Sequence, residues 1–481
     1  MIQHKLIRVI STLSATEIKA FQQFIESDFF NPNLNTRDLL AFLIPFHPEY
    51  QAEKLDELYI FGKLFPGEKY RAQRLREEFS RLFALLKKFL AYQEFQLHPE
   101  QEAIWTLAQF RKRKLPKAFQ TQWKAIQKSL DQETMKDAEY YRLQSELAQE
   151  ANGLFGSKEI RIADDSLQTW VDNLDIFYLT HKLRESCEML NRQHILNADY
   201  ELRMMGQVAE YLNHEGKSLL DIPAIRIYYQ IFLMFTQPEE ESHYAILVNL
   251  LNENHPSFSP EEGRGMYKYV QNYCIRKINQ GNSEYLTKLF RLYQSELENG
   301  IIFSNGWLAH TDYKNIVTVG LRVGEFTWVH DFLYEYQEKV AEPFRMNVFN
   351  YCLASWYQEK GQHDQAIRLL QKVEFTDLQY QISARYLLFK AYYETEEWES
   401  LIYLIKAFQN FIRRNKGIST DNRVNHRNFL KILQLLVRLR MRQDFLETEE
   451  FERRYGKIED QLMENQSVPH LGWLRERLRD L

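Results

Sequence analysis

Apolar residues recur at helical spacing along most of this chain. In the segment LSATEIKAFQQFIESDFFNPN, Ile18, Phe21 and Ile25 fall on one face of a helix. Ser14 is followed three positions later by Glu17, which fits a capping box at the start of that helix. The pattern therefore predicts a capped amphipathic helix near the N-terminus.

Three further helices are predicted before residue 96, over 36–44, 55–64 and 70–95. Prolines follow the first two, and the third carries the longest apolar face. Together these elements predict a small helical bundle over 1–95. Short connected helices also occur in helix-turn-helix DNA readers. None of these helices begins with the short polar and basic residues that read base edges, so a capping or docking module is favoured.

The next segment also has a helical pattern, from 102 to 149, until Gly153 and Gly156 interrupt it. We therefore expect a helical connector over 96–165. The densest basic run of the chain, RKRKLPK, occupies 111–117. It is interpreted as an exposed helix end before a proline rather than as a polyanion-binding patch, because such runs are common on solvated helix ends.

A longer unit is repeated further along the chain. The segment LASWYQEKGQHDQAIRLLQKV, residues 353–373, returns in weaker form 35 residues later as LFKAYYETEEWESLIYLIKAF. Positions 8, 11, 15 and 20 of the first copy hold a small residue, a tyrosine, a glycine and a second small residue: Ala354, Tyr357, Gly361 and Ala366. This spacing resembles the tetratricopeptide repeat, a helix-turn-helix of about 34 residues. Small residues let the two helices approach closely, and the glycine permits the left-handed conformation that ends the first helix.

Weaker copies place a glycine at the same turn. Gly324 lies 37 residues before Gly361, and Gly281 lies 43 residues earlier again. The spacing drifts, but each copy has an apolar helix, a turn with glycine and a second apolar helix. We therefore expect an array over 266–414, extended by helix pairs over 166–260.

The resemblance implies an all-α protein in which the N-terminal helical bundle is followed by a right-handed α-solenoid. The solenoid of tetratricopeptide-like helix pairs is expected over 166–481, including C-terminal capping helices. The segments LSATEIKAFQQFIESDFFNPN and LDIFYLTHKLRESCEMLNRQ are also similar to an uncharacterised family of bacterial helical-repeat proteins. That second resemblance implies no activity.

The composition fits a helical protein of moderate charge. Only 17 glycines and 12 prolines occur in 481 residues, aromatic residues make up 14%, and the net charge is -5.

Cys187, Cys274 and Cys352 lie far apart and form no CxxC pair, which favours a reducing compartment. The chain start lacks the pattern of a signal peptide, and no apolar run approaches the length of a membrane span. We expect a soluble, cytoplasmic protein with no membrane partner.

No catalytic or cofactor motif is found in the sequence. The patterns GxxxxGK[ST], GxGxxG, HExxH and GxSxG are missing, and the 13 histidines form no group with metal-ligand spacing. We therefore predict no catalytic residues, no cofactor and no metal, and a protein that is not an enzyme.

The tetratricopeptide resemblance implies that the first helix of each unit lines a concave face where a peptide or protein partner binds. The residues expected to contact that partner are Lys314, Thr318, Arg322, Tyr351, Ser355, Gln358, Tyr386, Lys390 and Tyr393. Some of these tyrosines are alternatively packed between units. The lysine and asparagines of the family's carboxylate clamp are only partly matched by Lys314 and Asn315, so no C-terminal carboxylate ligand is predicted. The favoured function is a non-catalytic scaffold or adaptor.

A basic segment supplies the competing hypothesis. Residues 406–442 contain ten lysines and arginines against the single acid Asp421. Clustered cations bind polyanions, so the alternative function is a regulator associated with nucleic acid. Its expected polyanion-binding residues are Arg413, Arg414, Lys416, Arg423 and Arg427. Pairing of these cations within the chain, with the glutamates of 447–452, is the other interpretation.

Overall fold

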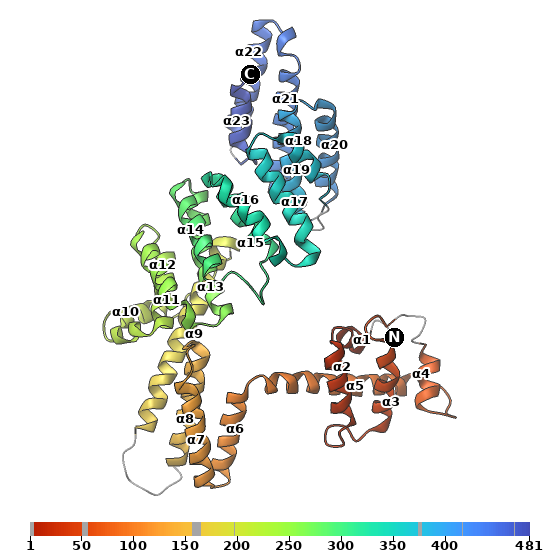
Figure 1. Ribbon diagram of the computed structural model, residues 1–481, viewed down its shortest axis with the longest axis vertical. Coiled ribbons are helices and arrows are strands. Elements are labelled where there is room, and N and C mark those ends of the chain that lie inside the picture. The colour runs from red at the N-terminus through yellow and green to blue at the C-terminus, as the bar shows by residue number, and fades with distance from the viewer. Residues whose placement is uncertain are drawn as a thin grey trace. The chain divides into compact units, whose positions relative to one another are not determined.

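The computed structural model describes residues 4–50, 56–155, 165–196, 198–373, 378–415, 417–465 and 467–481. Helices make up 78% of the structure, and the described part contains two isolated β-bridges but no strand. The prediction of an all-α protein is therefore confirmed. The chain forms two compact units, Met1–His181 and Lys182–Leu481, each of which is described by itself below (Figure 1).

The first unit begins with five helices that pack around one hydrophobic core. These helices are α1 (Lys5–Ile10), α2 (Ala15–Glu26), α3 (Leu34–Leu43), α4 (Glu57–Leu64) and α5 (Ala72–Gln96), with a 3-10 turn at Ile44–Phe46. The predicted capping box is present, because the Ser14 hydroxyl accepts from the Glu17 amide and the Glu17 carboxylate accepts from the Ser14 amide. Phe21, Phe61 and Phe79 are fully buried in this core.

A second core in the first unit lies between α6 (Pro99–Lys112), α7 (Pro116–Asp131) and α8 (Ala138–Phe155). The basic run at 111–117 spans the turn between α6 and α7, where Lys114 takes a positive φ of 56°. Arg111 forms an ion pair with α8, because its Nε lies 2.6 Å from the Glu150 carboxylate. Helix α9 (Ser166–Leu196) then passes from the first unit into the second.

The second unit consists of helices that mostly contact their neighbours along the chain. From α13 to α23, every helix packs against the next one. The helices are α10 (Met205–Asn213), α11 (Pro223–Thr236), α12 (Ser242–Asn254), α13 (Pro260–Asn279), α14 (Glu284–Glu298), α15 (His310–Val323), α16 (Phe326–Glu335), α17 (Glu342–Glu359), α18 (His363–Leu370), α19 (Leu378–Glu394), α20 (Trp398–Arg414), α21 (Thr420–Arg440), α22 (Thr448–Glu464) and α23 (Leu471–Arg479). Short 3-10 turns occupy Lys217–Asp221, His255–Ser257, Gln337–Lys339 and Gln443–Phe445.

The helix pairs α13–α14, α15–α16, α17–α18 and α19–α20 follow one another along this unit (Figure 1). All four share one turn geometry. Gly281, Gly324 and Gly361 take positive φ values of 97°, 91° and 72° at the turn of the first three pairs. Glu396 holds the same place in the fourth pair with φ 56°. The predicted left-handed glycines are therefore confirmed, and the fourth turn keeps the conformation without a glycine.

One backbone hydrogen bond accompanies each of these turns. The amide just after the left-handed residue donates to the carbonyl five residues earlier, as from Gln362 to Tyr357 at 2.9 Å and from Glu397 to Tyr392 at 2.9 Å. The same bond measures 3.0 Å in each of the other two pairs. This is the Schellman arrangement, which satisfies a carbonyl at the end of the first helix.

Small residues bring the paired helices close together, as the repeat pattern predicts. Ala354 on α17 and Ala366 on α18 are both completely buried. In the pair α15–α16 this role falls to Gly320, where an added Cβ would lie 2.5 Å from Cγ2 of Val329. The pairs α15–α16 and α17–α18 therefore pack closely through different small residues.

Candidate ligand-binding face of helices α15, α17 and α19

Polar contacts join the first helices of different pairs. The Lys268 ammonium on α13 lies 2.5 Å from a carboxylate oxygen of Asp312 on α15. Lys314, also on α15, places its ammonium 4.5 Å from the ring centroid of Tyr380 and 3.5 Å from the Ser383 hydroxyl, both on α19. The first helices are thus linked directly to one another rather than only through the second helix of each pair.

Two of the residues predicted to bind a partner meet at this point. The ammonium of Lys314 also lies 5.4 Å from the ring centroid of Tyr351 on α17. Tyr351 is only 7% exposed, and burial raises the pKa of its phenol. The ring therefore serves mainly to support Lys314 by a cation–π contact, and little of it is left for a ligand.

Helix α15 presents an exposed polar stripe that includes two predicted residues. Asn315, Thr318 and Arg322 are all exposed, and their spacing of three and four residues puts them on one face of the helix. The Thr318 hydroxyl donates to the Lys314 carbonyl at 2.8 Å, which leaves its oxygen facing outward as an acceptor. This stripe, Asn315–Thr318–Arg322, offers an amide, a hydroxyl and a guanidinium to a ligand.

Helix α17 contributes Ser355 and Gln358, both half-buried. The Ser355 hydroxyl donates to the Tyr351 carbonyl at 3.0 Å. The Gln358 side-chain oxygen is buried and has no hydrogen-bond partner within the described part of the chain. A buried acceptor without a donor is costly, but this oxygen is inaccessible from solvent and offers no contact to a ligand.

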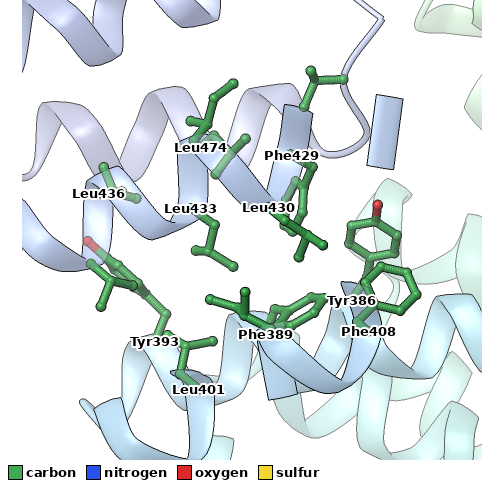
Figure 2. Close-up of a cluster of buried hydrophobic side chains, with 14 of the residues drawn as sticks. Tyr386, Phe389, Tyr393, Leu401, Phe408, Phe429, Leu430, Leu433, Leu436 and Leu474 are labelled. Atoms are coloured by element: carbon green, nitrogen blue, oxygen red, sulfur yellow. The ribbon is translucent and has the colours of Figure 1, made fainter. Parts of the chain in front are cut away.

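The three predicted residues on α19 are covered by the C-terminal helices instead. The Tyr386 hydroxyl lies 2.7 Å from Nδ1 of His426 on α21, and Tyr393 packs edge-on against Trp473 on α23. The Lys390 ammonium lies 5.9 Å from the centroid of the same Trp473 ring, and burial lowers the pKa of this amine. Figure 2 shows Tyr386 and Tyr393 within this cluster of buried side chains. Tyr386 and Tyr393 therefore act as core residues and are inaccessible to a partner.

The predicted polyanion-binding residues lie at the end of α20 and the start of α21. Arg413, Arg414 and Arg427 are exposed, while Arg423 is half-buried and donates to the Asn415 carbonyl at 2.9 Å. Lys416 lies outside the described residues. Arg413 and Arg427 are separated from each other by the turn between the two helices.

Pairing of this basic segment with the following acidic helix is not observed. Within the described residues, the arginines of α21 form no ion pair with a carboxylate of α22. Arg440 instead contacts Glu396 at 3.3 Å, and Glu450 pairs with Arg453 and Arg454 of its own helix. The interpretation that the glutamates of 447–452 pair with this basic segment is therefore wrong for the described residues, because Glu450 pairs within its own helix and Glu447, Glu449 and Glu452 are exposed.

One apolar pocket in the first unit was not predicted from sequence. It has a volume of about 580 Å³ and lies between α7, α8 and the start of α9, with Phe119, Trp123 and Leu147 among its lining residues. The indole nitrogen of Trp123 is buried and has no hydrogen-bond partner in the described part. The only sequence signal for this pocket is the pair Phe119 and Trp123, which lie four positions apart on one face of α7.

Reactive groups are sparse in the described structure. All three cysteines are buried thiols, and burial raises the pKa of each, to about 12 for Cys274. The described residues hold no group of three or more His, Cys, Asp or Glu side chains placed to bind a metal ion. None of their helices has the length and apolar character required to cross a bilayer.

No family model, no curated protein and no solved structure matches the chain.

Proposed function

We propose that this protein is a non-catalytic interaction scaffold whose second unit is a right-handed solenoid of tetratricopeptide-like helix pairs. The repeated Schellman turn at Gly281, Gly324, Gly361 and Glu396 supports this arrangement, because it gives each pair the same chain reversal. The contact of Lys268 with Asp312 and that of Lys314 with Tyr351 join successive first helices and support it further. Such stacking leaves the first helices on a common face.

The ligand that suits this face is an extended peptide segment carrying an acidic side chain. Arg322 supplies an exposed guanidinium for a carboxylate, and Asn315 and Thr318 supply groups that bind peptide amides. The observation that carries the proposal is the exposed stripe Asn315–Thr318–Arg322 on α15. This first helix is held in place by contacts with the first helices α13 and α17. The three buried thiols support a reducing, cytoplasmic setting.

Affinity capture with quantitative mass spectrometry tests this proposal. The triple variant Asn315→Ala, Thr318→Ala, Arg322→Glu should lose the proteins that the wild-type chain retains. Arg368→Glu is the matched control, because Arg368 is an exposed cation on α18, a second helix. Equal retention by the wild type and the triple variant would refute the proposed face, and equal loss in the control would show that charge alone is responsible.

A second candidate function rests on the exposed cations at the junction of α20 and α21. Arg413, Arg414 and Arg427 have no carboxylate within ion-pair distance in the described residues, so they are able to contact phosphates of a nucleic acid. A salt titration with generic DNA and RNA tests this alternative. Absence of binding at low salt would eliminate it.

A further inference from the structure

A concave, positively charged pocket lies at the other end of α21, between that helix and α22. Its volume is about 670 Å³, and Leu435, Leu439 and Ile458 line it with apolar surface. The charged residues around it are Arg438, Arg442, Arg453, Arg454, Lys457 and Glu450. Five cations thus surround one carboxylate in a pocket large enough to hold a small molecule.

The charges of this pocket are not balanced within the chain. Glu450 lies 2.5 Å from Arg453 and 2.6 Å from Arg454, and these contacts lower the pKa of its carboxyl group. The other three cations, Arg438, Arg442 and Lys457, are exposed and have no carboxylate within ion-pair distance among the described residues. A single carboxylate therefore contacts two arginines, three cations have no carboxylate partner, and the pocket keeps a net excess of four positive charges.

Helix stability does not account for this arrangement. Arg438 lies in the last turn of α21, where a cation stabilises the negative end of the helix. Arg453, Arg454 and Lys457 lie in the interior of α22, however, and Lys457 is four residues after Arg453 and three after Arg454. Like charges at these spacings repel and weaken a helix. An anion bound in the pocket would remove that repulsion.

We propose that the pocket between α21 and α22 binds a compact anion built on a chain of two or three phosphate groups. Arginine guanidinium groups bind phosphate oxygens in pairs, and four of the five cations are arginines. The apolar surface of Leu435, Leu439 and Ile458 allows either an inorganic chain or the phosphate chain of a nucleotide to sit there. This site goes beyond the scaffold function and does not depend on it.

The pocket is distinct from the basic residues considered for nucleic acid. Arg427 precedes Arg438 by eleven residues on the same helix, which corresponds to about 16 Å along its axis. A long polyanion would contact both ends of α21, whereas a compact phosphate chain would occupy only the pocket. Substitutions in the pocket at the C-terminal end of α21 therefore test the proposal, and substitutions near its N-terminal end serve as the control.

Isothermal titration calorimetry of the full chain with sodium tripolyphosphate at about 150 mM salt tests the site. We expect saturable binding that Arg438→Gln with Arg442→Gln weakens about tenfold or more. The control pair Arg413→Gln with Arg427→Gln removes the same charge from the opposite end and should change the affinity less than about twofold. Lys457→Gln provides an independent single variant, and thermal unfolding verifies that every variant is folded.

Parallel titrations with adenosine triphosphate and with a single-stranded oligonucleotide identify the source of the phosphates. Equal affinity for tripolyphosphate and the nucleotide shows that the phosphate chain alone is bound, and tighter nucleotide binding shows that the apolar surface holds a base. No saturable tripolyphosphate binding would overturn the proposal. Equal weakening by the two double variants would also overturn it, and together with tight oligonucleotide binding would indicate a nucleic-acid surface instead.

Discussion

The ammonium of Lys314 lies 4.5 Å from the centroid of the Tyr380 ring, and this contact joins α15 to α19 across α17. The same ammonium lies over Tyr351 on α17. One cation is thus shared by aromatic rings from two further helices. Because the ring faces are electron-rich, the contact favours a fixed spacing of the three first helices.

Lys314→Met should therefore loosen the three helices while keeping the apolar stem of the side chain. We expect a loss of about 1–2 kcal/mol in stability, the range of partly desolvated cation–π contacts. Hydrogen exchange of the full chain should become faster in α15, α17 and α19. Lys372→Met is the control, because Lys372 is exposed. Unchanged protection in the Lys314 variant would show that the contact is incidental.

Gly320 should not tolerate a methyl group. A Cβ at this position would lie 2.5 Å from Val329 Cγ2 and 3.1 Å from Phe290 Cε2, so Gly320→Ala should destabilise the protein by about 1–3 kcal/mol in thermal unfolding. Adding Val329→Ala should recover part of this loss. Gly263→Ala is the matched control, since its Cβ would meet nothing within 4 Å in helix α13. That change should be neutral or stabilise by up to about 1 kcal/mol.

Glu296 should make stability depend on pH near neutrality. Its carboxyl is 2% exposed, and burial raises its pKa from 4.5 to about 7 despite the hydrogen bond from Gln271 at 2.6 Å. Between these values the folded state holds a proton that the unfolded state has lost, so this contribution to stability falls as pH rises from about 4.5 to 7.

Glu296→Gln should remove that dependence. The variant keeps an acceptor for Gln271, and we expect it to be more stable than the wild type at pH 8 by up to about 3 kcal/mol. Denaturant unfolding at pH 5, 6, 7 and 8 measures the difference. Glu298→Gln, an exposed neighbour on the same helix, should leave the pH profile unchanged. A parallel profile for the wild type and Glu296→Gln would contradict the proposed titration.

Much of the local structure follows from short-range sequence patterns. The Ser14–Glu17 capping box and the left-handed glycines at 281, 324 and 361 were predictable, because each depends on residues within one turn. Glu396 was not predictable as a left-handed residue. Its turn is imposed by the helices on either side, which pack as in the other pairs.

The binding residues were harder to predict because their environment comes from distant parts of the chain. Tyr386 looks like a surface position in the repeat pattern, yet His426 and the C-terminal helices cover it. Similarly, the acidic residues of α22 suggested ion pairs with the arginines of α21. Glu450 instead pairs with Arg453 and Arg454, which lie three and four residues later on its own helix. The pocket that results depends on two helices meeting, and no single segment encodes it.

Site-specific photo-crosslinking tests the central claim most directly. A photo-reactive amino acid is placed at Thr318 or Arg322 on the exposed stripe, or at Arg368 on α18, in the full chain inside the cells that produce it. We predict the same crosslinked protein from positions 318 and 322 and none from position 368. Crosslinks from position 368 alone, or none from positions 318 and 322, would contradict a scaffold that binds along its first helices.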